Sequence, residues 1–217
     1  MKSPAVFFAV LCFAANVAAQ DASSRLRNFL NYTNTWQAEF EQVQPMAPNP
    51  NQKIKIRRLD TKEGEVFMVK PNKLRWETKG KNGRLVVSDG NILWHHDNAL
   101  KQVVRQKLSA TREATPSAIF EGAKTMDEQF NLENETRADG LQGVKLTPKD
   151  ENSPFFEIHL GLEDGVPKSL EFSDAYGFES RITFYKSRVN KKIDPKLFEY
   201  EIPAGIELID LTDSDEG

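Results

Sequence analysis

The sequence predicts a mainly β fold with a few helices (α+β), built as one domain around an antiparallel sheet. Apolar and polar residues alternate through most of the chain, which is the pattern of strands with one face in water. Asp-Gly pairs stand between several of these runs and favour hairpin turns. No linker, internal repeat or low-complexity segment divides the chain, so one domain accounts for its 217 residues.

The first 19 residues are typical of a cleavable export signal rather than of the folded domain. A positive start precedes an apolar stretch over residues 6–15, which is too short to span a membrane, and small residues follow it. Cleavage after Ala19 removes Cys12, the only cysteine, and leaves no disulfide, cysteine metal site or cysteine nucleophile. We therefore expect a single domain over residues 20–210, followed by an acidic tail over residues 211–217.

The domain opens with a helix and then changes to strand periodicity. Ser23 or Ser24 can cap a helix whose residues Leu26, Phe29 and Leu30 fall on one face. The strand alternation begins after this helix and is interrupted by a loop rich in proline and asparagine at residues 44–51. The strands that the alternation predicts lie at residues 36–41, 53–57, 66–68, 74–76, 85–87, 92–94, 101–104, 144–146, 155–160, 169–172 and 181–185.

Helical segments interrupt this meander in the second half of the chain. Thr115 and Pro116 are typical of a helix start and lead into an apolar group that ends before Gly122. A second short helix is expected over residues 124–130. A sheet of this length is expected to curl on itself, and the inserted helices are the available cover for its inner face.

Composition and motifs argue against several classes of function. The formal net charge is −3 and the basic residues are dispersed, which argues against a nucleic-acid partner. Nothing after residue 19 is long and apolar enough to cross a bilayer. No nucleophile elbow surrounds Ser88, and no phosphate loop or dinucleotide motif is present, so we expect neither an enzyme nor a cofactor. A hydrolase that uses an unrecognised pair of carboxylates stays open as an alternative.

The histidines give little support to a metal site. His95, His96 and Asp97 form the one sequence cluster that resembles metal ligands. Adjacent residues on a strand point to opposite faces, so one ion cannot easily use both histidines. We expect no bound metal.

Five segments together resemble a known family. They are residues 36–42, the glycine-led strand and Pro-Asn corner at 64–76, the hairpin at 85–94, the helix start at 115–120, and the closing segment at 198–210. In this order they are similar to the outer-membrane lipoprotein carrier protein family, LolA. The resemblance implies an unclosed antiparallel β-barrel, covered by an N-terminal helix and an inserted helical lid, with an apolar cavity between sheet and lid.

The resemblance also implies a function, a location and partners. Members of this family receive triacylated lipoproteins from an inner-membrane ABC transporter, LolCDE, cross the periplasm, and deliver them to the outer-membrane receptor LolB. It implies a monomer without stable membrane insertion. A second interpretation is a periplasmic sensor on the same half-barrel, similar to RseB. That relative carries a further C-terminal domain, and this chain stops soon after Asp210.

The resemblance assigns candidate site residues. Lys70, just before the Pro-Asn corner, stands where the family holds its empty lid shut, usually with an arginine; a lysine offers a flexible point charge in place of a planar fork. An ordinary core role is the alternative for the tryptophans, and a helix face with no opening role is the alternative for Ile119 and Phe120. The residues expected to line the acyl cavity are Val66, Met68, Leu74, Trp76, Trp94, Ile119 and Phe120.

Overall fold

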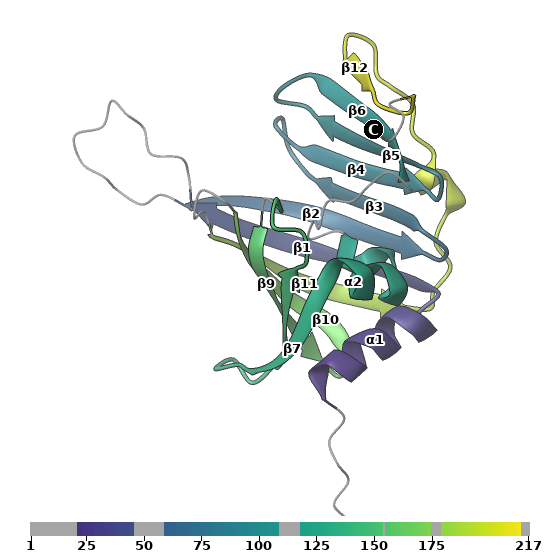
Figure 1. Ribbon diagram of the computed structural model, residues 1–217. Helices are drawn as coiled ribbons and strands as arrows, with labels where there is room; N and C mark the ends of the chain where they lie inside the picture. Colours follow the sequence, from purple (N-terminus) through teal and green to yellow (C-terminus); the bar gives the residue numbers. More distant parts are fainter. Residues whose placement is uncertain (1–20, 46–58, 109–117, 154, 175–178, 214–217) are drawn as a thin grey trace, which may run out of the picture.

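The computed structural model describes residues 21–45, 59–108, 118–153, 155–174 and 179–213. They form one sheet of twelve strands with both α-helices on one side of it (Figure 1). The export signal, the strand expected around Ile54 and Ile56, and the expected helix start at Thr115 and Pro116 lie outside the described residues.

The elements alternate as the sequence predicts, with a helix first, a run of strands, a helical insertion and a second run of strands. In chain order they are α1 (Ala22–Tyr32), β1 (Thr35–Pro45), β2 (Leu59–Val69), β3 (Lys73–Thr78), β4 (Arg84–Asp89), β5 (Ile92–Asp97), β6 (Gln102–Lys107), the 3-10 helix η2 (Ala118–Glu121), α2 (Ala123–Gln129), β7 (Phe130–Thr136), β8 (Gln142–Pro148), β9 (Phe155–Glu163), β10 (Val166–Asp174), β11 (Glu179–Val189), the 3-10 helix η3 (Pro195–Phe198) and β12 (Glu207–Asp210).

The sheet is antiparallel and unclosed. The strand order is β12-β6-β5-β4-β3-β2-β1-β11-β10-β9-β8-β7, and β12 beside β6 is the one parallel pair in this order. β1 therefore joins two halves, with β2–β6 on one side and β7–β11 on the other. The edge strands β7 and β12 do not pair with each other. Figure 1 shows the two halves turned relative to each other, with α1 and α2 over the face that they enclose. This confirms the predicted fold class.

Helix α1 forms where the apolar spacing predicts it, with a different cap. Asp21, rather than Ser23 or Ser24, is the N-cap residue, and its carboxylate accepts a hydrogen bond of 2.7 Å from the backbone N–H of Ser24. Leu26 and Leu30 are buried against the sheet beside Phe29. The helix is therefore held mainly by its apolar face.

Three segments differ from the sequence prediction. β1 continues through Gln44 into the segment expected as a loop, because Gln44 and Pro45 still pair with β2. α2 ends at Gln129 and is followed directly by β7, which was not predicted; its sequence, FNLENET, has few apolar residues to reveal an alternation. In the closing segment, only Glu207–Asp210 is a strand, while Pro195–Phe198 is a 3-10 helix.

A glycine allows the closest packing at the centre of the sheet. The ring of Phe40 lies over Gly64 on the neighbouring strand β2. A Cβ atom at this position would come within 2.1 Å of the Phe40 ring and 2.3 Å of the carbonyl oxygen of Glu77. Gly64, in the middle of β2, is therefore needed for the aromatic packing above it.

Candidate functional site

The space between the inner face of the sheet and the helices is occupied by aromatic rings. Trp36 of β1 is fully buried, with ring centroids 4.9 Å from Phe120 of η2, 5.3 Å from Phe184 of β11 and 5.7 Å from Phe29 of α1. One ring thus touches the sheet, the N-terminal helix and the inserted helical segment. These contacts make Trp36 the meeting point of the three layers.

Trp76 extends this aromatic cluster along the sheet. Its ring centroid lies 4.9 Å from Phe40, 5.8 Å from Phe184 and 6.1 Å from Phe120. Unlike Trp36, Trp76 is only half-buried. The apolar interior therefore reaches solvent beside Trp76.

Six of the seven predicted cavity residues come together here. The five fully buried members belong to the same hydrophobic cluster, and Trp76 packs against it. Cross-strand pairing places four of them on one face, Val66 opposite Trp76 and Met68 opposite Leu74. Ile119 and Phe120 of η2 cover that face. Whether these six residues contact acyl chains stays a prediction.

The structure does not bring Trp94 to this group. Trp94 pairs with Val87 and Arg105, on the face of the sheet opposite to Leu93 and Leu74. Its ring lies 5.9 Å from Tyr200 in the segment that follows η3. The outer face of β3–β6 thus has its own cover, which sequence alternation alone does not reveal. We leave Trp94 out of the proposed acyl-binding wall.

The sequence analysis did not single out several central side chains. Phe40 and Phe184 lie in predicted strands and are fully buried, and Met126 of α2 is also fully buried. Their positions in the alternation could have identified the two phenylalanines as inward-facing. Nothing local to Met126 indicates that α2 packs into this interior.

The two inserted helices bridge the halves of the sheet. η2 contacts β3, whereas α2 contacts β7 and α1. Arg27 of α1 forms an ion pair with Asp127 of α2, in which its Nε and Nη2 atoms donate hydrogen bonds of 3.0 to 3.2 Å to the carboxylate. Lys149 donates a hydrogen bond of 2.6 Å to the backbone carbonyl of Asp127. We call η2 and α2 together the lid (residues 118–129).

Lys70 lies at the corner after β2, as the sequence analysis expected. Its backbone N–H donates a hydrogen bond of 2.9 Å to the carbonyl of Asn34, between α1 and β1. The side chain is half-buried, and this burial lowers the pKa of Lys70. Among the described residues, none forms a hydrogen bond or an ion pair with its ammonium group. The latch role therefore stays a prediction.

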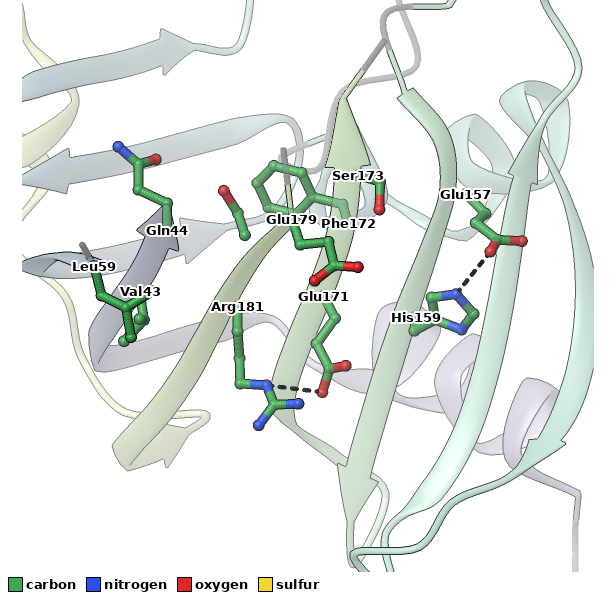
Figure 2. A pocket seen from close by; sticks show the side chains of 11 residues that line it. Val43, Gln44, Leu59, Glu157, His159, Glu171, Phe172, Ser173, Glu179 and Arg181 are labelled. Atoms are coloured by element: carbon green, nitrogen blue, oxygen red, sulfur yellow. Dashed lines mark ion pairs between the residues drawn. The ribbon is translucent and has the colours of Figure 1, made fainter. Parts of the chain in front are cut away.

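A separate cleft of about 780 Å³ lies where β1, β2, β9, β10 and β11 end (Figure 2). It combines apolar residues such as Leu59 and Phe172 with charged ones. Arg181 Nε lies 3.3 Å from a carboxylate oxygen of Glu171. None of the predicted cavity residues is among the described residues that line it. This cleft is distinct from the interior under the lid.

A histidine at the rim of this cleft is held between carboxylates. His159 Nδ1 lies 2.7 Å from Glu135, and His159 Nε2 lies 3.3 Å from Glu157. Burial alone would lower the pKa of His159, but the two carboxylates outweigh it, and the pKa is raised. Acidic and basic side chains thus pair with each other at the rim of this cleft.

Two further properties bear on the class of protein. Over the described ranges, no group of three histidine, cysteine, aspartate or glutamate residues is arranged to hold a metal ion. In the same part of the chain, no helix has the length and apolar character needed to cross a membrane.

The sequence and the structure were each compared with known proteins. The family model for outer membrane lipoprotein carrier protein LolA matches residues 31–201. The chain is 30% identical over 203 residues to an outer-membrane lipoprotein carrier protein of Methylococcus capsulatus, covering 93% of this chain and 94% of the relative. A solved LolA superfamily protein of Nitrosomonas europaea is 13% identical, with a TM-score of 0.42 over 82% of this chain and 96% of that one. MucB is 15% identical, with a TM-score of 0.42 over 87% of this chain and 64% of that one.

Proposed function

The chain belongs to the family of outer-membrane lipoprotein carrier proteins, LolA, and from this premise we propose that it shelters the acyl chains of lipoproteins under its lid. It would take triacylated lipoproteins from an inner-membrane ABC transporter of the LolCDE kind and deliver them to an outer-membrane receptor of the LolB kind. The export signal expected at residues 1–19 supports a periplasmic location. No catalytic role is proposed for any residue.

One observation carries the proposal, namely a continuous apolar interior that the lid covers together with α1. Val66, Met68 and Leu74 line the sheet side of this interior, and Ile119 and Phe120 close it from the lid. The side chains pack against one another, so acyl chains can enter only when the lid moves away. α2 has 7 residues, and Met126 is its buried member. Such a short helix depends on its packing for stability and can detach without unfolding the sheet.

The energetics of the cargo favour this arrangement. Burial of an acyl methylene is worth about 0.8 kcal/mol, so a sixteen-carbon chain is worth roughly 12 kcal/mol and three chains more than about 30 kcal/mol. Escape of such a molecule through water is negligibly slow. A carrier must offer an apolar surface in place of the bilayer and hide that surface when it is empty, which a packed, movable lid does.

Isolation of the protein from cells tests the transport proposal. Purified from cell envelopes in which the outer-membrane receptor has been depleted, the protein should carry acylated lipoprotein, detected by mass spectrometry. Addition of the receptor should release that cargo. If no acylated protein co-purifies even under depletion, the carrier proposal loses its support.

The latch role of Lys70 is tested by Lys70→Leu. Loss of the charge should loosen the lid, which should raise the fluorescence of an apolar dye such as ANS and slow the release of cargo to the receptor. Lys73→Leu is the matched control. It removes the same charge from β3, where the residue pairs with Val69 and therefore lies on the face of the sheet opposite to Met68 and Leu74. Equal dye binding by wild type and Lys70→Leu, with unchanged delivery, would remove Lys70 from the mechanism.

A further inference from the structure

The indole N–H of Trp36 has no hydrogen-bond partner. The side chain is fully buried, and within the described part of the chain no atom accepts from Nε1. A buried tryptophan usually pairs this group, because an unmade hydrogen bond in an apolar interior costs free energy. The chain places this unpaired donor in the aromatic cluster at the centre of the candidate site.

The surroundings of Trp36 indicate when this donor becomes accessible. Phe120 of the lid stacks on the indole at 4.9 Å with an interplanar angle of 31°. Phe184 and Phe29 contact it edge-on at interplanar angles of 71° and 88°. Phe120 belongs to the lid, so removal of the lid uncovers Trp36, whereas Phe184 belongs to the sheet and stays. The unpaired N–H of Trp36 therefore becomes accessible to a ligand when the interior opens.

Few chemical groups can serve as the acceptor for the Trp36 N–H. It must accept a hydrogen bond and must otherwise be apolar enough to enter this interior. The carbonyl oxygen of an acyl ester has both properties, since it accepts without donating and is attached to a hydrocarbon chain. We propose that Trp36 Nε1 donates a hydrogen bond to an acyl carbonyl of the ligand and thereby distinguishes acylated molecules from plain hydrocarbons. This inference rests on the proposed function and specifies the ligand chemistry of the same site.

The test replaces the N–H and keeps the shape. Trp36 is replaced by 3-benzothienylalanine, in which sulfur stands for the N–H group, and the same replacement at Trp94 on the outer face is the control. Each protein is titrated with two synthetic lipopeptides that differ only in linkage, one with palmitoyl esters and the other with hexadecyl ethers. At Trp36, the replacement should reduce the ratio of ester to ether affinity by about 3- to 10-fold, the range of a net hydrogen bond. At Trp94 the ratio should stay at the wild-type value.

A second readout separates this role from a structural one. In the empty protein the unpaired N–H lowers the stability of the folded state. Its removal at Trp36 should therefore raise the midpoint temperature of thermal unfolding by about 2–4 °C. A lower midpoint would mean that the N–H is already satisfied, for instance by a neighbouring ring, and would overturn the inference. An unchanged ester-to-ether ratio in a protein that binds both lipopeptides would also overturn it. If wild type binds neither lipopeptide, the proposed function itself fails.

Discussion

Phe184→Ala should lower the free energy of unfolding by about 3–5 kcal/mol, whereas Phe120→Ala should lower it by less than half as much. Both rings are fully buried in the same aromatic cluster and contact Trp36 and Trp76. They differ in the element that carries them. Phe184 lies on β11, which pairs with the central strand β1. Truncation of this ring therefore leaves a cavity that the folded sheet cannot close by releasing one of its elements.

Phe120 lies on η2, and the energetic cost of its truncation is limited by the free energy that holds the lid on the sheet. If the variant's lid is already detached, the missing Phe120 contacts cannot lower the free energy of unfolding of the sheet any further. We therefore expect Phe120→Ala to bind ANS strongly while the sheet stays folded. Denaturant unfolding followed by circular dichroism gives both stabilities. Equal losses for the two variants, without added dye binding, would show that the lid is an inseparable part of the core.

Trp76→Glu should weaken the binding of a triacylated lipopeptide by at least about 100-fold. A carboxylate placed against an apolar ligand surface costs several kcal/mol, and about 2.7 kcal/mol corresponds to this factor. Trp76 is half-buried at the edge of the interior, so the empty protein can direct the new carboxylate toward water and remain folded. The penalty therefore falls mainly on the loaded state.

The outer face of the same sheet supplies the matched control for Trp76→Glu. Trp94 is also a half-buried tryptophan and packs on Tyr200. Trp94→Glu introduces the same side chain without altering the interior, so lipopeptide affinity should stay within about twofold of wild type. Isothermal titration calorimetry on both folded variants measures their affinities for the lipopeptide. Wild-type affinity in Trp76→Glu, or equal losses at the two positions, would place the acyl chains elsewhere.

Local sequence patterns predicted most of the sheet, because alternation and Asp-Gly turns are properties of neighbouring residues. The pair Val66 and Met68 shows this well, since both face inward as their spacing requires. β7 was missed because only Phe130 and Leu132 mark its inner face. The closing segment was predicted as a longer strand because its alternation cannot reveal that only its end pairs with β6.

The site was less accessible to sequence reasoning, because its geometry depends on contacts between distant segments. Trp94 follows the hairpin turn after β4, and only the register of that hairpin shows that it faces away from Trp76. The ion pair of Arg27 with Asp127 joins residues 100 positions apart. The unpaired N–H of Trp36 is visible only once all of its neighbours are in place.

The position of the acyl chains in the loaded protein tests the central claim most directly. Lipoprotein complexes would be formed with palmitoyl chains that carry a photoreactive group, irradiated, and mapped by mass spectrometry. We expect crosslinks to the inner face of the sheet and the lid, above all to Leu74, Trp76 and Phe120. Crosslinks confined to the outer face beside Trp94, or to the cleft beside Phe172, would contradict the account.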